Sequence, residues 1–215
     1  MTDLHTRPLL PRASLERIGE HAVLLPDFVS QASLLLADVQ QVVHAAPWRH
    51  MVTPGGLTMS VAMTNCGEVG WVSDRQGYRY QRTDPQSALP WPPMPAAMNE
   101  LAKRAAGAAG FSGFEPDACL INRYVPGSRL SAHQDRNERD LAAPVVSVSL
   151  GLPVIFLFGG ATRRHPSTRV ALNHGDVVVW GGSQRLAFHS VLKLTEGDHP
   201  VTGPCRINLT FRRAL

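Results

Sequence analysis

The sequence has few cysteines, and their spacing does not indicate a structural role. The 215 residues include three cysteines, Cys66, Cys119 and Cys205, with no CxxC pair among them. An odd number of widely spaced cysteines argues against a disulfide framework and is typical of proteins kept in a reducing compartment. We therefore expect a cytoplasmic protein.

Long apolar runs, internal repeats and low-complexity tracts are also missing. No stretch approaches the roughly 20 apolar residues needed to cross a bilayer. The first twenty residues, MTDLHTRPLLPRASLERIGE, mix charges with prolines and lack the apolar core of a secretion signal. These absences exclude a membrane-spanning or exported protein at the level of sequence. We expect one domain over residues 1–215 and, by default, a monomer.

Lysine is scarce, with only Lys103 and Lys193 among 21 basic residues. Arginine suits planar, bidentate contacts to phosphate and carboxylate. The net charge is +4, because 21 basic residues oppose 17 acidic ones. A polyanionic partner and a mildly basic surface explain this modest excess equally well.

The N-terminal half predicts two helices and a turn-rich segment. Apolar residues at helical spacing indicate a helix over residues 30–46 with Ser30 as N-cap, and Gly110 ends a second helix over residues 99–110. The remaining segments are an arm over 1–17, a strand over 21–28 ended by Pro26, and the turn-rich region 47–95, which holds three of the four tryptophans.

The C-terminal half predicts a β-sheet structure. Short β-rich runs follow one another between Gly, Pro, Asp and Asn turns, a pattern typical of a sandwich or barrel. The runs are ACLINRYV, VVSVSLGL, VIFLFGG, RVALN, DVVVWGG, AFHSVLKL and RINLTFR. The expected fold is mainly β with flanking helices (α+β), in which two N-terminal helices pack on a jelly-roll core over residues 116–213.

One polar stretch, LSAHQDRNERD at residues 130–140, carries a candidate metal-binding pair. In a strand, residues two apart point to the same face, so His133 and Asp135 could both face the interior of a barrel. His189, in the run AFHSV, would complete the set of two imidazoles and one carboxylate that binds non-haem Fe(II). A solvated loop and a structural histidine explain these residues as readily when each is taken alone.

The strand RINLTFR at residues 206–212 alternates polar and apolar side chains. If its apolar residues face the core, Arg206 and Arg212 lie in water, as in an ordinary sandwich. If its polar face points into the barrel, the two guanidiniums can bind a dicarboxylate such as 2-oxoglutarate. The arginines begin about 20 Å apart along the strand, so both side chains would have to lean inward. Asn122 and Tyr124, in the run INRY, could bind the same acid.

The order HxD, then His, then RxNxTFR resembles the AlkB-type Fe(II)/2-oxoglutarate-dependent nucleic-acid dealkylases. The likeness covers residues 22–212 and includes MVTPGGLTMSVAMTNCG, GWVSDRQGY, PDACLINRYVPGSRLSAHQD, PVVSVSLGLPVIFLFGG and HGDVVVWGG. It implies a double-stranded β-helix core with a nucleotide-recognition lid over residues 47–95. It also implies direct-reversal DNA repair by oxidative dealkylation of 1-methyladenine and 3-methylcytosine in single-stranded DNA. The implied reaction uses Fe(II), O2 and 2-oxoglutarate and releases succinate, CO2 and formaldehyde. RNA and locally opened duplex stay open as further partners.

The resemblance also implies a role for each matching residue. His133, Asp135 and His189 match the iron ligands, and Asn122, Tyr124, Arg206, Asn208 and Arg212 match the 2-oxoglutarate site. Trp71 and Tyr78 match an aromatic wall and phosphate-side contacts of the damaged nucleotide, and Met63, Ser131 and Arg163 match other substrate-side positions. Read without the resemblance, Trp71 is a buried loop anchor and Tyr78 a turn residue.

One position departs from the family pattern. After HQD, the pattern has a basic residue and then a second acid, whereas here Arg136 is followed by Asn137. A carboxylate there would favour a positively charged methylated base. We expect the neutral Asn137 to lower the preference for cationic lesions over neutral ones.

Two rival hypotheses fit the same residues. The iron and cosubstrate motifs also fit an Fe(II)/2-oxoglutarate hydroxylase of a protein or a small molecule, because only residues 51–80 indicate nucleic acid. A jelly-roll binding module with structural histidines would bind no iron and release no succinate.

Overall fold

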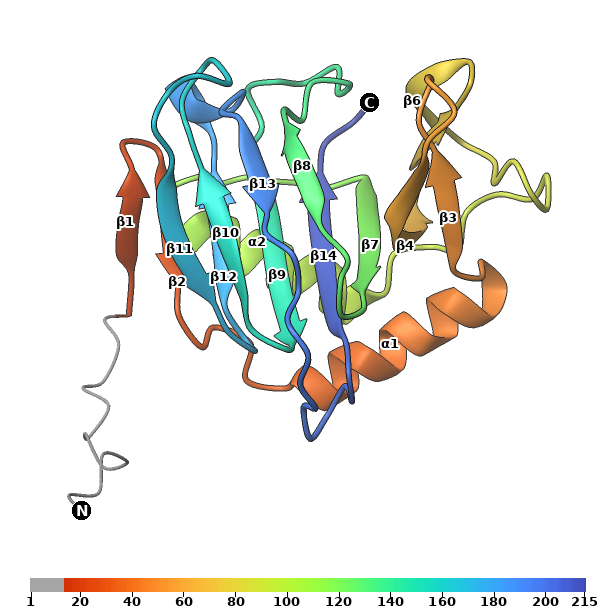
Figure 1. Ribbon diagram of the computed structural model, residues 1–215, viewed down its shortest axis with the longest axis horizontal. Helices are drawn as coiled ribbons and strands as arrows, with labels where there is room; N and C mark the ends of the chain where they lie inside the picture. The colour runs from red at the N-terminus through yellow and green to blue at the C-terminus, as the bar shows by residue number, and fades with distance from the viewer. Residues whose placement is uncertain (1–13) are drawn as a thin grey trace.

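Two antiparallel β-sheets face each other and form the body of the protein (Figure 1). The computed structural model describes residues 14–215. In this range the larger sheet has eight strands in the order β1-β2-β12-β9-β14-β7-β4-β3, and the smaller sheet has four in the order β11-β10-β13-β8. A separate hairpin, β5–β6, projects beside β3 and β4. This arrangement is the expected double-stranded β-helix, or jelly roll, with flanking helices.

The strand bounds follow the short β-rich runs of the sequence. The larger sheet comprises β1 (Glu16–Gly19), β2 (Ala22–Leu25), β3 (Arg49–Val52), β4 (Thr58–Gly67), β7 (Ala118–Tyr124), β9 (Val145–Gly151), β12 (Val177–Trp180) and β14 (Arg206–Arg212). The smaller sheet comprises β8 (Leu130–His133), β10 (Val154–Phe158), β11 (Thr168–Leu172) and β13 (His189–Val191), and the hairpin comprises β5 (Gly70–Asp74) and β6 (Gly77–Gln81).

Two helices pack on the outer face of the larger sheet. The apolar spacing of α1 (Ala32–Ala45) places Leu35 and Val39 on one buried face, and α2 (Ala96–Ala108) buries Met98 and Leu101 in the same core. Within residues 14–215 no helix is long and apolar enough to span a membrane.

The ends of the helices test two local predictions. Gly110 has φ +89°, and the Phe111 N–H donates to the Ala106 carbonyl (2.8 Å), so glycine ends α2 as expected. The predicted N-cap Ser30 is wrong: the cap position of α1 is Gln31, without a side-chain cap hydrogen bond. The Val29 N–H donates to the Gly175 carbonyl (3.1 Å), which ties the chain just before the helix to the loop preceding β12.

Strand β14 is buried on both faces, which decides between the two readings of its alternating pattern. Ile207, Leu209 and Phe211 belong to the core under the helices. The opposite face, which carries Arg206 and Arg212, is also buried, with only 1% and 5% of these residues exposed. The arginines therefore point between the two sheets and not into solvent. The ordinary-sandwich reading was right about the apolar face but wrong about the arginines, which do not lie in water.

The segment 47–95 contains more regular structure than the sequence predicted. The turn-rich reading was wrong for β3, β4, β5 and β6. Strand β4 is ten residues long, and its Ala62–Gly67 part pairs with β7 in the larger sheet. Strand β4 mixes Thr, Ser and Asn with Ala and Met, so its alternation is weak. Its pairing with β7 supplies backbone hydrogen bonds that residue propensity alone does not indicate.

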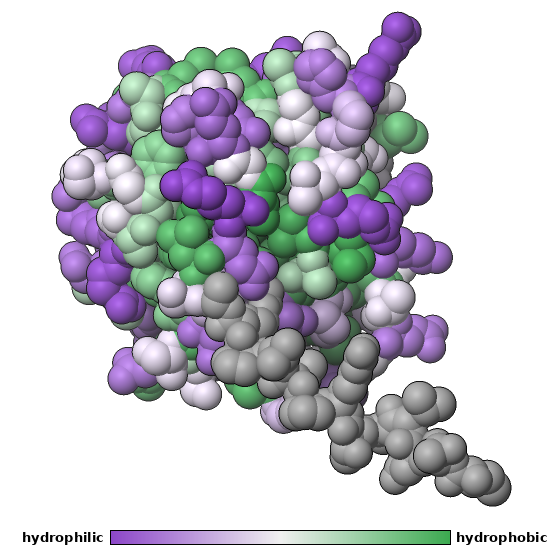
Figure 2. All heavy atoms as spheres, turned by 90° about the vertical axis from the view of Figure 1, so that its left-hand side faces the viewer, coloured by the Kyte–Doolittle hydropathy of each residue, from purple (hydrophilic) through white to green (hydrophobic). Residues whose placement is uncertain are grey.

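The predicted arm over residues 1–17 also differs from the structure at its end. Residues 1–13 lie outside the described residues, whereas Glu16 and Arg17 already belong to β1, which pairs with β2. Strands β1 and β11 are the edge strands at this side of the two sheets. Figure 2 shows this side, where hydrophobic residues are visible among hydrophilic ones, as on a mixed protein surface.

Candidate metal and cosubstrate site

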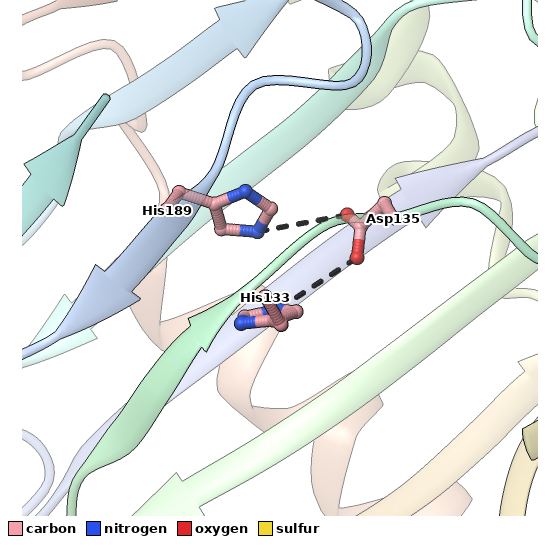
Figure 3. Close-up of side chains that lie close together, drawn as sticks. All are labelled: His133, Asp135 and His189. Carbon is pink, nitrogen blue, oxygen red and sulfur yellow. Dashed lines mark ion pairs between the residues drawn. The ribbon is translucent and has the colours of Figure 1, made fainter. Parts of the chain in front are cut away.

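Two histidines and one aspartate gather between the two sheets (Figure 3). His133 ends β8, His189 begins β13, and the two residues are direct cross-strand partners. Asp135 lies in the loop after β8, so the turn of this loop, and not a shared strand face, brings it to the histidines. Asp135 carboxylate oxygens lie 3.8 Å from His133 Nε2 and 3.9 Å from His189 Nε2. Among residues 14–215, these side chains form the group whose potential ligand atoms lie within 4.8 Å of one another.

Backbone hydrogen bonds leave the inner nitrogen of each histidine available. The Nδ1–H of His133 donates to the Ser131 carbonyl (2.9 Å), and that of His189 donates to the Ala187 carbonyl (3.0 Å). This pairing fixes the tautomer in which Nε2 carries a free lone pair. Burial, reinforced by the neighbouring His133, lowers the pKa of His189 to about 3, so its imidazole is neutral near pH 7. The set can therefore ligate a divalent cation.

Asp135 is held ionised and fixed in position by two arginines. The guanidinium of Arg212 donates to Asp135 Oδ2 through Nε (3.0 Å) and Nη2 (2.8 Å), and Arg185 Nη1 donates to the Asp135 carbonyl (2.7 Å). Burial acts to raise the pKa of this carboxyl, but the charge of Arg212 and the adjacent His189 and His133 together hold it well below its usual range. The carboxylate is thus preorganised as a charged ligand.

Arg206 presents a buried cation that has no anionic partner in the part of the chain that the structure describes. Its Nη2 donates to Ser149 Oγ (2.8 Å), and its guanidinium lies 5.0 Å from the centre of the Tyr124 ring. Its Nε and Nη1 are buried and have no hydrogen-bond partner among the described residues. An unpaired buried guanidinium is costly, so this site fits the carboxylate of a ligand. Arg212 lines the same cavity, and its Nε and Nη2 donate to Asp135.

Two serines of β9 support this polar interior and were missed by the sequence analysis. Asn208 Nδ2 donates to Ser147 Oγ (2.8 Å), and Arg206 donates to Ser149. In the run VVSVSLG the serines alternate with Val146, Val148 and Leu150, which pack under the helices. That period-2 alternation was the available signal that one face of β9 is polar although the strand is buried.

A cavity of about 690 Å³ joins these groups. Its volume lies within the usual range for small-molecule sites. All the site residues predicted from the sequence line it: Met63, Trp71, Tyr78, Asn122, Tyr124, Ser131, His133, Asp135, Asn137, Arg163, His189, Arg206, Asn208 and Arg212. Residues from both halves of the chain therefore meet in one space.

Aromatic side chains of the β5–β6 hairpin line the outer part of this cavity. The rings of Trp71 and Tyr78 stack with centroids 5.6 Å apart and planes inclined by 15°. Asn65 holds the Trp71 backbone from both sides, accepting from its N–H (2.9 Å) and donating to its carbonyl (3.0 Å). Trp71 Nε1 also lies 3.4 Å from Asn137 Oδ1. Tyr78 is 44% exposed, so the pair offers a flat aromatic surface reachable from solvent.

Comparison with known proteins agrees with this chemistry. A sequence model of the 2OG-Fe(II) oxygenase superfamily matches residues 21–212, and the chain belongs to this superfamily. The alpha-ketoglutarate-dependent dioxygenase AlkB of Escherichia coli (strain K12) is 56% identical over 200 residues, which cover 93% of each chain. The nucleic acid dioxygenase ALKBH1 of Mus musculus is 36% identical over 136 residues, which cover 63% of this chain and 34% of that protein. The structure of OsALKBH1 superimposes with a TM-score of 0.81 at 27% identity, covering 93% of this chain and 99% of the other.

The protein is therefore an AlkB-type Fe(II)/2-oxoglutarate-dependent dioxygenase. Its cosubstrates are 2-oxoglutarate and O2, and its metal is iron. The triad, in which Asp135 and His189 are buried, and the buried guanidinium nitrogens of Arg206 that lack a partner among residues 14–215 fit these groups. A binding module with purely structural histidines is excluded by this membership.

Proposed function

We propose that this dioxygenase oxidatively removes alkyl groups from N-alkylated bases, of the 1-methyladenine and 3-methylcytosine type, in single-stranded DNA. The stacked pair Trp71 and Tyr78 at the outer part of the cavity carries this proposal. Aromatic faces bind unstacked bases of any sequence, with about 1–3 kcal/mol per base. The mouse relative's name, nucleic acid dioxygenase, and that of the Schizosaccharomyces pombe relative, tRNA demethylase, support nucleic acid as the substrate class.

The inner residues would hold the metal and the cosubstrate. His133, Asp135 and His189 would bind Fe(II), and Arg206 would pair with a carboxylate of 2-oxoglutarate, with Asn122, Tyr124, Asn208 and Arg212 around it. When bound, iron, 2-oxoglutarate and O2 supply the oxidation of the N-alkyl carbon, with succinate and CO2 as coproducts. The protein's own part is to fix Asp135 through Arg212 and Arg185 and to exclude water around Arg206.

The outer residues would select and orient the base. A base inside a duplex cannot reach a buried metal site, so the nucleotide must be flipped out or already single-stranded. Trp71 and Tyr78 would stack on it, while Met63, Ser131 and Arg163 line other parts of the cavity. Hydroxylation of the N-methyl carbon gives a hemiaminal, which breaks its C–N bond to release formaldehyde and the unmodified base. In this proposal residues 47–95 act as the nucleotide-recognition lid of one domain over residues 1–215.

Asn137 would set the preference among lesions. Its Oδ1 lies near Trp71 Nε1, so its amide borders the aromatic surface. An amide is neutral and both donates and accepts hydrogen bonds. Cationic 3-methylcytosine therefore gains no ion pair at this position, and neutral 3-methylthymine should be turned over at a more similar rate than with a carboxylate there.

Further parts of the proposal concern the setting in which the enzyme works. The three cysteines are free thiols, including the cross-strand partners Cys66 and Cys119, which supports a reducing, cytoplasmic environment. We propose a monomeric enzyme. A hydroxylase of a protein or small molecule is the alternative substrate class for the same inner site.

A panel of substrates tests the proposed function. Equal amounts of 3-methylcytosine in single-stranded DNA, single-stranded RNA and duplex DNA are incubated with enzyme, Fe(II), 2-oxoglutarate and air, and formaldehyde is measured. The greatest release is expected from a single strand, with duplex DNA slower by the cost of flipping, a few kcal/mol. If no nucleic acid releases formaldehyde while succinate still forms with another substrate class, the substrate proposal is wrong.

A further inference from the structure

A buried carboxylate next to the metal site has no part in the cofactor set described above. Glu138 lies three residues after Asp135 in the same loop, and its side chain is 2% exposed. It is not among the clustered potential metal ligands of the described residues. A buried charge persists only when it is paired and hydrogen-bonded. Its partners therefore indicate what it does.

Glu138 joins the two arginines that hold Asp135. Its Oε2 accepts from Arg185 Nη2 (3.1 Å), and its Oε1 lies 3.5 Å from Arg212 Nε. These are the arginines that donate to the carbonyl and the carboxylate of Asp135. Two guanidiniums and two carboxylates thus form a closed, charge-balanced cluster. Glu138 therefore contacts both of the arginines that hold Asp135.

The third partner of Glu138 comes from the hairpin. The Tyr80 hydroxyl donates to Glu138 Oε1 (2.7 Å). Burial raises the pKa of Tyr80 well above its usual value, so the phenol stays protonated and able to donate. Tyr80 is the cross-strand partner of Trp71, and it lies two residues after Tyr78. One face of the hairpin therefore carries both stacking rings and this hydroxyl.

The hairpin is not part of either main sheet, so side chains must position it. Within the described range 14–215, strands β5 and β6 pair only with each other. Ser73 Oγ donates to the Val52 carbonyl (2.7 Å) and anchors the hairpin to β3. This anchor is separate from the loop after β8 that carries Asp135 and Glu138, called the metal loop below. Toward the metal loop, Trp71 Nε1 reaches Asn137 at 3.4 Å, whereas the Tyr80–Glu138 bond is shorter (2.7 Å), partly buried and charge-assisted.

We propose that Tyr80 and Glu138 are positioning residues that latch the stacking hairpin onto the metal loop, so that a base held by the hairpin is set at a fixed place relative to the iron site. The inference rests on the proposed function. Neither residue contacts the reacting atoms. Tyr80 acts on Trp71 and Tyr78 through the hairpin, and Glu138 acts on Asp135 through Arg212.

Removing only the Tyr80 hydroxyl tests the latch. In Tyr80→Phe, kcat/KM for a methylated single-stranded oligonucleotide should fall roughly tenfold, as expected for loss of one charge-assisted hydrogen bond. The affinity of the metal-free protein for the same oligonucleotide, measured by fluorescence anisotropy, should weaken by a similar factor. The anaerobic charge-transfer band with Fe(II) and 2-oxoglutarate and the KM for 2-oxoglutarate should stay within about twofold of the wild type.

Ser73→Ala is the matched comparison, because it removes another hydroxyl that anchors the same hairpin. It should change oligonucleotide affinity less than about twofold. Equal losses in both variants, or wild-type affinity and kcat/KM in Tyr80→Phe, would overturn the latch. If the wild type binds the oligonucleotide but releases no formaldehyde, the proposed function fails, and the affinity comparison still decides the latch.

Glu138→Gln separates the two ends of the latch. Glutamine retains an oxygen that can accept from Tyr80, but it removes the charge that faces Arg212 and Arg185. Its oligonucleotide affinity should stay closer to that of the wild type than the affinity of Tyr80→Phe does. Its Fe(II)/2-oxoglutarate band should shift or weaken. The opposite pattern, weak oligonucleotide binding with an unchanged band, would contradict the assignment of Glu138.

Discussion

The inner and outer halves of the cavity are built in different ways. In the inner half, Arg206 and Asn122 lie on central strands of the larger sheet and are 1% and 3% exposed. The metal-binding residues come from the smaller sheet and from the loop after β8. The outer half lies on a separate hairpin and on loops, where Tyr78 is 44% exposed and Asn137 is exposed. The groups that would bind the cosubstrate away from water are therefore carried by buried strands. Groups that must admit a large polymer are carried by the surface.

The difference indicates that the inner half determines the reaction and the outer half determines the substrate. Ion pairs and backbone hydrogen bonds fix the inner side chains before any ligand binds, as the Arg212–Asp135 contact shows. The outer aromatic pair has one flat exposed face and few polar contacts. Damage to the inner half should abolish chemistry on every substrate. Damage to the outer half should weaken substrate binding and leave the metal site intact.

Loss of an iron ligand should have the largest effect. In His133→Ala, the anaerobic charge-transfer band should disappear, and formaldehyde release should fall by more than the roughly 100-fold that loss of an outer-shell partner can cost. Thermal melting of the metal-free variant serves as the control for folding. A retained band would show that His133 is not a ligand.

Arg206→Met should come next. Removing one partner of a buried charge pair costs about 2–5 kcal/mol, so the KM for 2-oxoglutarate should rise roughly 30-fold or more. The matched control is Arg123→Met on the neighbouring strand β7. The Arg123 guanidinium lies over Trp48, which packs against the core under the helices, and Arg123 does not line the cavity. Similar KM values for 2-oxoglutarate in the two variants would contradict the assignment of Arg206.

Trp71→Ala should give a smaller, substrate-specific effect. Loss of about 1–3 kcal/mol of stacking raises the KM for a methylated oligonucleotide roughly 5–100-fold. The iron band and the KM for 2-oxoglutarate should be unchanged, and Trp71→Phe should restore part of the affinity. If the iron band were lost in Trp71→Ala, the inner and outer halves of the cavity would not be independent.

Asn137→Asp should produce the smallest change. A carboxylate about 4 Å from a cationic base contributes about 1 kcal/mol in water, so preference for 3-methylcytosine over 3-methylthymine should rise roughly fivefold. Competition between the two lesions in one single-stranded oligonucleotide measures the ratio. An unchanged ratio would remove Asn137 from the set that determines lesion preference.

The sequence predicted the residues of the inner half better than it predicted strands β3 to β6 and the contact between Tyr80 and Glu138. The motifs RINLTFR and HxD contain the arginines, histidine and aspartate that the reaction needs. The fold places these residues and His189 around one cavity. The strands β3 to β6 could not be predicted in the same way, because β4 is stabilised by pairing with distant β7 and not by its own alternation. The link from Tyr80 to Glu138 spans 58 residues and follows no local pattern.

The link between inner and outer halves is tested most directly by formaldehyde and succinate measured together. The wild-type enzyme is given a single-stranded oligonucleotide that contains 3-methylcytosine, with and without 2-oxoglutarate. Equal amounts of formaldehyde and succinate, and neither product without 2-oxoglutarate, are expected. Formaldehyde without 2-oxoglutarate, or none in its presence, would contradict the coupling of this iron site to an alkylated base.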